Sequence, residues 1–312
     1  MASKSFLARF LTMFGDLKIF GWPMFLLYDP GSFKVKGDET RALMDMIEPG
    51  DILVRGYHNY LDGHFIPGYF SHVGLYVGEV VEGDRESVNA AARGLKDKES
   101  AIFHTGKQMV IHALAEGVLL EDLISFSRCD YLAVLRFPST LRLRAKDWKP
   151  LAPLSPREQK IHDDLHEGVR VNFSDVFGCI KDAALGKLGT DYDFDFNFNR
   201  FDYLSCSELV YFATKCVGAF LNVDVEDRRV LMFLRRSLIQ PDAFASAPLD
   251  VVWRSRSLDV QKLKALNPAF DRPPPVAQLA APTGVSSRAT PSPSQYASQS
   301  APSANSAAPR SP

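Results

Sequence analysis

Strand-like patterns gather in one stretch of the chain, and this arrangement restricts the fold more than any other feature. Between residues 48 and 137, short apolar runs are separated by turns or polar segments, at residues 52–54, 71–78, 109–114, 118–120 and 131–137. Successive side chains of a strand point to opposite faces, so the alternation of Val73, Leu75 and Val77 indicates one buried face. These runs predict most of an antiparallel sheet.

The pattern becomes helical further along the chain. Residues 156–169 and 174–188 have helical charge and apolar spacing. Asp191–Asn199 alternates polar and aromatic residues, and we expect an extended segment there. A calcium loop would need Gly and Glu where Phe196 and Asp202 stand, so no metal is expected. The whole pattern predicts an α+β fold.

One helix start carries a cysteine. Ser205 and Glu208 form an S-x-x-E capping box, which predicts a helix that begins at Cys206 and continues to Phe220 with one buried face. At the first helical position, unpaired backbone N–H groups and the helix dipole favour an anion. We therefore expect a lowered pKa and a nucleophilic thiol at Cys206.

The other cysteines are interpreted as structural thiols. Cys129, Cys179 and Cys216 have no local activating feature, and the chain has no C-x-x-C motif. A chain of 312 residues does not need disulfides to stabilise its core. We expect free thiols in a reducing compartment, and hence a cytoplasmic location.

Two histidines, His72 and His112, lie inside apolar strand patterns. The other five belong to predicted loops or to a polar helix face: His58, His64, His104, His162 and His166. The last two are four residues apart, but no third ligand of matching type follows in the sequence. We expect solvated helix surface there and no metal site.

Five motifs, taken in order, carry a family resemblance: Gly50-Asp51-Ile52-Leu53, Phe70–Gly78, Val110–Ala113, Tyr192-Asp193-Phe194 and Cys206–Val210. Their order resembles the circularly permuted NlpC-type papain-like cysteine hydrolases of bacteria, in the YiiX-like branch. That branch is related to the lecithin retinol acyltransferase-like proteins. The resemblance spans residues 48–215 and implies a papain-like α+β fold, with a central antiparallel sheet packed against the helix that carries the nucleophile.

The resemblance also implies a catalytic set. Cys206 would be the nucleophile, His72 the general base, and His112 the group that orients His72. Glu116 is an alternative third residue if the register differs by a few positions.

Further site residues follow from their positions beside the nucleophile. Ser207 and the backbone N–H groups at the helix start are candidates for an oxyanion hole, and Tyr203 is a candidate to line the site. The resemblance implies hydrolysis of an amide bond in a peptide or cell-wall peptide, without a cofactor. A lipid-directed thioesterase, acyltransferase or phospholipase with the same triad is an alternative, and a non-catalytic binding module is a third.

The chain divides into three predicted regions. Residues 1–47 form an N-terminal extension, and residues 48–270 form the catalytic domain, with an insertion at 79–108. Residues 271–312 contain 9 of the 20 prolines, with many Ser and Ala, and this composition predicts a disordered tail.

Charge and the N-terminal segment bear on partners. The chain has 36 Lys and Arg against 37 Asp and Glu, which argues against a nucleic-acid partner. Residues 1–30 hold two apolar runs, Phe6–Phe14 and Ile19–Tyr28, both shorter than a membrane span of about 20 residues. We expect a short helix and an extended segment packed on the domain. Alternatives are a secretory signal and peripheral contact with the inner membrane face, with three cations at the headgroups: Lys4, Arg9 and Lys18.

Overall fold

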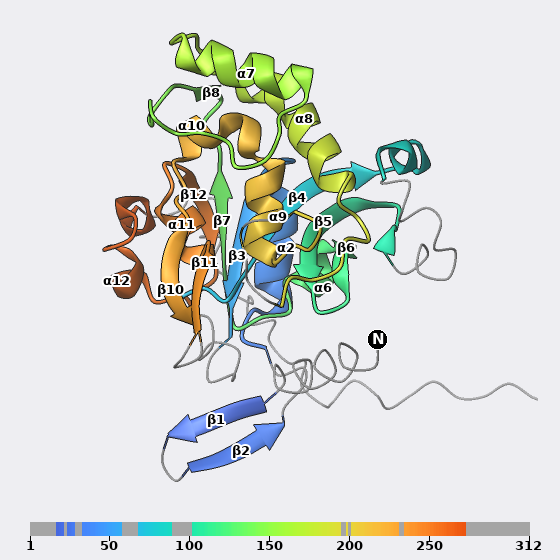
Figure 1. Cartoon of the computed structure of the whole chain (residues 1–312). Coiled ribbons are helices and arrows are strands. Elements are labelled where there is room, and N and C mark those ends of the chain that lie inside the picture. The colour runs from blue at the N-terminus through green and yellow to red at the C-terminus, as the bar shows by residue number, and fades with distance from the viewer. Residues whose placement is uncertain are drawn as a thin grey trace, which may run out of the picture. The chain divides into compact units, whose positions relative to one another are not determined.

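A six-stranded antiparallel sheet forms the centre of the computed structural model (Figure 1). The model describes residues 17–21, 24–28, 33–57, 68–88, 102–194, 198, 201–230 and 234–272. The strand order is β12-β7-β3-β4-β5-β6. The strand bounds are β3 Ile52–Gly56, β4 His72–Val80, β5 Gly106–Leu114, β6 Gly117–Asp122, β7 Tyr131–Arg136 and β12 Asp250–Arg254. The sheet and its helices confirm the α+β class.

The first five of these strands coincide with the apolar runs in the sequence, and β12 was not predicted. It reaches the sheet from the C-terminal region and pairs with β7 at the edge, with a register shift between Val251 and Trp253. Such a pairing depends on long-range contacts, because a short strand far from its partner has no local turn signal.

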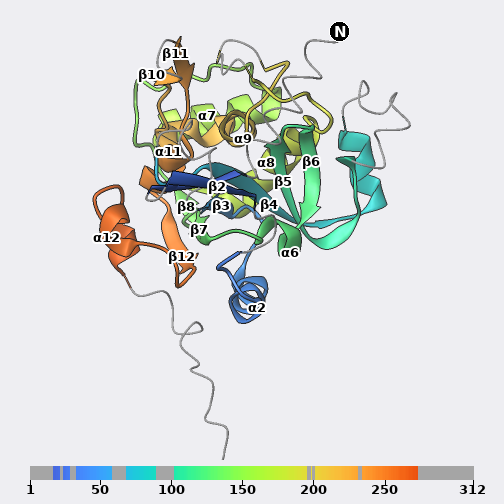
Figure 2. The same cartoon turned by 90° about the horizontal axis from the view of Figure 1, so that it is seen from below.

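Helices cover both faces of the sheet (Figure 2). In that view, α7, α8 and α9 lie above the sheet, and α2 lies below it. The helical bounds are α2 Gly37–Met46, α6 Leu123–Phe126, α7 Pro156–His166, α8 Phe173–Leu185, α9 Cys206–Ala213, α10 Gly218–Leu221, α11 Pro241–Ser246 and α12 Val260–Leu263. Three 3₁₀ turns are η1 Glu82–Ser87, η2 Lys215–Val217 and η3 Pro268–Asp271.

Strand alternation divides the core into two layers. Val73 and Leu75 of β4 belong to the layer that contains Leu209 of α9, so the expected packing of the Cys206 helix against the sheet is present. Tyr76 of β4 belongs to the other layer, with Phe126 of α6. His72 shares the face of Tyr76, because the two residues are four positions apart in one strand.

The helix that begins at Cys206 is shorter than its apolar spacing predicts. The capping box is present, since the Ser205 N–H donates to Glu208 Oε2 at 2.7 Å. The helix ends at Ala213, and Thr214 Oγ1 donates to the Val210 carbonyl at 2.7 Å. A 3₁₀ turn and the separate helix α10 then carry the apolar residues onward. The apolar stripe therefore continues across a break in the helix.

In the part of the chain that the structure describes, three two-stranded pairs lie outside the central sheet. They are β1 Leu17–Gly21 with β2 Met24–Tyr28, β8 Thr140–Leu141 with β9 Val171–Asn172, and β10 Glu226–Val230 with β11 Leu234–Leu238. The extended segment expected at Ile19–Tyr28 is thus seen as strands in both parts that the structure describes.

Several predictions concern residues outside the described part of the chain. They are the N-terminal helix at Phe6–Phe14, residues 58–67 of the predicted loop that holds His58 and His64, the middle of the insertion at 89–101 and the tail from residue 273. In Asp191–Asn199, Asp191 makes one parallel bridge to Tyr203, and the adjoining described residues 192–194 form no strand. The chain separates into two units, Met1–Gln278 and Leu279–Pro312.

Candidate active site

The two strand histidines are hydrogen-bonded to each other. His72, the first residue of β4, and His112 of β5 place Nε2 and Nδ1 2.9 Å apart. Their rings are nearly perpendicular, at 84°, with centroids 5.1 Å apart. Both side chains are buried, and His112 has no exposed surface. A buried pair of imidazoles in direct contact is a geometry in which one ring orients the other.

An arginine borders the histidine pair on the next strand. Arg55 of β3 stands opposite His72 in the register and is buried. Its guanidinium carbon lies 4.1 Å from the centroid of the Phe126 ring, and Nη1 donates to the Phe126 carbonyl. Arg55 Nε has no hydrogen-bond partner among the described residues. A buried cation therefore lies beside the two imidazoles.

A carboxylate borders the pair on the other side. Glu121 of β6 places Oε2 3.2 Å from His112 Nε2, although the approach is not well aligned for a linear hydrogen bond. Both imidazole rings also contact Phe126, with ring centroids 5.8 and 5.1 Å away for His72 and His112. Four neighbouring strands thus contribute a polar row of Arg55, His72, His112 and Glu121, in which the first three side chains are buried and Glu121 is half-buried.

Glu121 was not among the residues expected from the sequence, where Glu116 was the alternative to His112 as the third residue. The structure places Glu116 exposed in the turn between β5 and β6, where Leu114 pairs with Gly117. This turn puts Glu121 opposite Val110, on the same face of the hairpin as His112. A two-residue turn between Leu114 and Gly117 fixes the pairing of all residues further along the two strands. Since side chains alternate with a period of two, this register could have been worked out from the sequence.

The polar row specifies which nitrogen of each imidazole carries a proton. An ionised carboxylate only accepts hydrogen bonds, so Glu121 requires a proton on His112 Nε2. A neutral His112 then has an accepting Nδ1, to which His72 Nε2–H donates. The neutral His72 is left with a lone pair on Nδ1, the atom that a general base needs.

Burial and the neighbouring charges keep both imidazoles neutral and the Glu121 carboxylate ionised. Burial lowers the pKa of His72 well below 6.5, and the positive charge of Arg55 lowers it further. Burial also lowers the pKa of His112, against the opposing effect of Glu121. Burial acts to raise the pKa of Glu121, but the contact with His112 and the charge of Arg55 outweigh it, so its pKa is lowered. Near neutral pH both imidazoles are neutral and Glu121 is ionised.

Cys206 is buried at the first position of α9. Its sulfur receives hydrogen bonds from the Val73 backbone N–H and from the backbone N–H and hydroxyl of Ser207. These donors favour the thiolate, yet burial outweighs them and raises the pKa of the Cys206 thiol. The expectation of a lowered pKa is therefore wrong, because position at a helix start gives no account of the desolvation of the thiol.

The thiol and the imidazole pair approach β4 from different sides. Cys206 belongs to the core layer of α9, whereas both imidazoles contact Phe126 in the opposite layer. The two groups are nevertheless close along β4. The imidazole belongs to His72, and the N–H that donates to the Cys206 sulfur belongs to the next residue, Val73. No hydrogen bond joins the Cys206 thiol to either ring among the described residues. The structure thus brings His72 and His112 together and places the Cys206 sulfur beside Val73, the residue that follows His72.

The remaining sequence candidates are placed as follows. Ser207 is buried beside the sulfur, as an oxyanion candidate must be, and Tyr203 is 39% exposed with a backbone bridge to Asp191. The other cysteines are buried free thiols, and burial raises the pKa of Cys129 and Cys216 to about 12.

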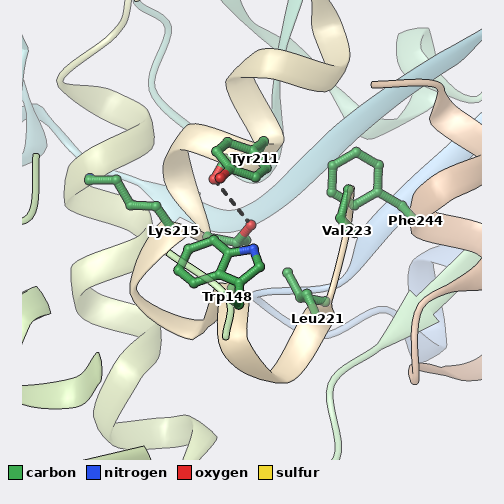
Figure 3. A pocket seen from close by; sticks show the side chains of 8 residues that line it. Trp148, Tyr211, Lys215, Leu221, Val223 and Phe244 are labelled. Carbon is green, nitrogen blue, oxygen red and sulfur yellow. Dashed lines mark hydrogen bonds between the residues drawn. The ribbon is translucent and has the colours of Figure 1, made fainter. Parts of the chain in front are cut away.

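A separate pocket beside α9 is filled by packing (Figure 3). Trp148 lies over Gly218, and a Cβ atom on that glycine would be only 2.0 Å from the indole Cζ2. Tyr211, Lys215, Val223 and other side chains complete its wall: Thr214, Leu221 and Phe244. None of these residues belongs to the polar row, so this pocket stabilises the turn from α9 to α10.

Comparisons with known proteins assign neither a family nor a function to this chain. No protein family, no curated protein and no solved structure matches the chain. Among the described residues, no group of three or more His, Cys, Asp or Glu side chains is arranged to hold a metal ion.

Proposed function

We propose that this chain is a cysteine hydrolase with a circularly permuted papain-like fold. It would cleave an amide bond in a peptide or acyl-amide substrate through an acyl-thioester on Cys206. The observation that supports this most is the contact between the Cys206 sulfur and the N–H of Val73, next to a His72 ring already oriented by His112. The His strand also precedes the Cys helix in the chain, as in the permuted hydrolases that the sequence resembles.

The first half-reaction forms the thioester. As Cys206 Sγ attacks the substrate carbonyl carbon, its proton passes to His72 Nδ1. The resulting imidazolium gives that proton to the leaving nitrogen, and the amide C–N bond breaks. In the second half-reaction His72 takes a proton from water, hydroxide adds to the thioester carbon, and the thiol leaves with that proton.

Proton transfer requires His72 Nδ1 and Cys206 Sγ to come into hydrogen-bond contact. In the free chain the two groups lie on different sides of β4, so this contact requires the His72 ring to move when substrate binds. Both groups in this chain rest in the neutral form, because burial raises the thiol pKa and lowers the imidazole pKa. The proposal is therefore general-base catalysis during attack, without a preformed thiolate–imidazolium pair.

Backbone donors at the helix start would stabilise the developing oxyanion. The first N–H groups of α9 have no intrahelical partner, and the Ser207 hydroxyl lies beside the sulfur. Removing one such donor from an acyl-transfer enzyme reduces kcat by roughly a hundredfold or more. Ser207→Ala is therefore expected to lower kcat more than it changes KM.

A trapping experiment tests this function. Cys206→Ser protein, incubated with peptidoglycan fragments and lipid extracts, is expected to accumulate an ester adduct, identified by intact-mass and peptide mass spectrometry. Cys179→Ser is the matched control and should remain unmodified, because Cys179 lies in α8 and does not belong to the polar row. Absence of any adduct, together with no hydrolysis by the unmodified protein, would reject the hydrolase and favour a binding module.

A lipid-directed activity of the same triad is the second candidate. The β1–β2 register pairs Ile19 with Leu26 and Phe20 with Phe25, so the pairs at these positions consist of apolar residues. No described helix is long and apolar enough to cross a membrane. We propose a cytoplasmic enzyme with peripheral contact to the inner membrane face through residues 1–30. Co-sedimentation with vesicles that drops in a Phe20→Asp/Phe25→Asp variant would support this candidate, and unchanged binding would count against it.

A further inference from the structure

A second cavity beside α9, with a volume of about 420 Å³, lies where α7, α8 and the end of α9 come together. Small-molecule sites have volumes of about 300–1,000 Å³, so this cavity is large enough for a ligand. None of its lining residues belongs to the polar row. Its charged and aromatic side chains are Arg157 and Glu158 of α7, Asp182 of α8, Lys187 just after α8, Phe212 of α9 and Lys215 of η2.

A buried ion pair forms one side of this cavity. The side chains of Lys215 and Glu158 are 3% and 6% exposed, and Lys215 Nζ donates to Glu158 Oε1. Glu158 Oε2 also accepts a hydrogen bond from the backbone N–H of Ser155 at 2.8 Å. Both charges are therefore compensated within the protein, and the pair is a structural part of the wall.

The other three charged side chains of the wall, Arg157, Asp182 and Lys187, form no ion pair with any residue that the structure describes. Arg157 is exposed, and its two terminal nitrogens lie 3.6 and 3.8 Å from the position of a Cβ atom added to Gly178 of α8. Lys187 Nζ donates to the Phe201 carbonyl at 2.7 Å, which leaves two of its three protons for other acceptors. The cavity therefore offers an excess of one positive charge and a guanidinium that can bind a ligand.

An aromatic ring completes the cavity. Lys187 Nζ and Lys215 Nζ lie 4.3 and 4.1 Å from the centroid of the Phe212 ring. Ala183 of α8 adds a small apolar surface to the wall. Burial lowers the pKa of Lys187, and the charge of Lys215 adds to this effect against the opposing charge of Asp202. The ammonium group of Lys187 is thus incompletely compensated, and an anion bound beside it would favour its charged form.

These features favour one class of ligand. A monoanion balances the single excess positive charge, and a carboxylate matches the planar guanidinium of Arg157 through two parallel hydrogen bonds. A phosphate monoester carries up to about two negative charges at neutral pH, which exceeds this charge and increases the repulsion with Asp182. An apolar body on the ligand would pack against the Phe212 ring.

We propose that this cavity binds a small organic carboxylate, with Arg157 as the partner of the carboxylate, Lys187 as a second cation and Phe212 beside the apolar body. This inference does not depend on the hydrolase function, because its test measures binding alone. Phe212 belongs to the helix that begins at Cys206, so the bound carboxylate would contact the helix that carries the proposed nucleophile.

The test titrates the full-length protein with benzoate and measures binding by isothermal titration calorimetry. Benzoate is expected to bind at a single saturable site. Benzamide has nearly the same shape but no charge, so it is expected to bind at least about tenfold more weakly, because charge-assisted hydrogen bonds are lost. Arg157→Gln should weaken benzoate binding by a similar factor, and Arg157→Lys should lose less affinity because it keeps the charge.

A matched control removes the same charge elsewhere. Arg170 is an exposed arginine outside the cavity, so Arg170→Gln should bind benzoate as the unmodified protein does. Ala183→Phe places a ring in the cavity and should abolish binding while Arg157 stays intact. Circular dichroism melts check that each variant folds. If Ala183→Phe does not fold, the comparison of R157Q with R170Q decides, because both substitutions replace exposed side chains.

Three results would overturn the proposal. One is the absence of saturable benzoate binding, or equal affinity for benzoate and benzamide. Another is equal affinity for benzoate in the R157Q and R170Q variants. The third is tighter binding of phenyl phosphate than of benzoate, which would assign the cavity to phosphate esters.

Discussion

His72 Nε2 and His112 Nδ1 lie 2.9 Å apart across β4 and β5, and this hydrogen bond leaves Nδ1 of His72 as the atom that accepts a proton. Glu121, beside His112 Nε2, specifies the direction of the bond. The chemical competence of the site therefore depends on Glu121, a residue of β6 that was not among the residues expected from the sequence.

Glu121→Gln is expected to lower kcat/KM of the proposed hydrolysis by roughly a hundredfold or more, because an amide can donate to His112 and reverse both tautomers. His72 Nδ1 would then carry a proton and could not act as the base. Steady-state kinetics measure the loss, and a circular dichroism melt checks the fold. Glu116→Gln is the control: Glu116 is exposed in the β5–β6 turn, so equal losses in the two variants would reject the assigned role of Glu121.

Alkylation of Cys206 by iodoacetamide is expected to be slow at neutral pH and still rising above pH 9. Burial raises the pKa of this thiol, and only the thiolate reacts. Peptide mapping separates Cys206 from Cys129 and Cys216, whose pKa values near 12 keep them unlabelled in the folded protein. A labelling profile that levels off below pH 8 would contradict the structure and indicate a preformed thiolate.

The free energy of unfolding is expected to fall as the pH drops below 6.5. The folded pKa values of His72 and His112 are lowered, so the unfolded chain binds protons first, while stability above pH 6.5 is unaffected by these groups. Each imidazole contributes a slope of about 1.4 kcal/mol per pH unit until the folded state also protonates. Urea titrations from pH 7.5 to 5 measure it. His104→Gln, which alters an exposed histidine, should keep the slope, and a flat profile in the parent would refute the prediction.

Gly218→Ala is expected to destabilise the fold by about 1–3 kcal/mol, because the added Cβ would lie 2.0 Å from the Trp148 indole. Urea denaturation gives the difference in unfolding free energy. At Gly37, the nearest atom to an added Cβ is a flexible Arg41 nitrogen 3.8 Å away, so Gly37→Ala should cost nothing measurable. Trp148→Leu combined with Gly218→Ala should recover part of the loss, and an additive loss would show that this contact is not the cause.

The sequence by itself determined the features that are local. Short apolar runs between turns or polar segments located β3 to β7, with period-two alternation clearest in β4, and the Ser205–Glu208 capping box located the start of α9 at Cys206. Both signals arise within a few residues, from strand pleating and from unpaired N–H groups at a helix end, so no partner needs to be known.

Tertiary structure alone decided how these elements meet. The β5–β6 register brought Glu121, and not Glu116, to His112, and the covering side chain of Phe126 buried both imidazoles. Packing of α9 onto the sheet buried Cys206 and reversed the expected direction of its pKa shift. These outcomes depend on which distant segment covers a group and at what register. Periodicity within one segment carries no information about that, because burial and pairing are properties of the contact between segments.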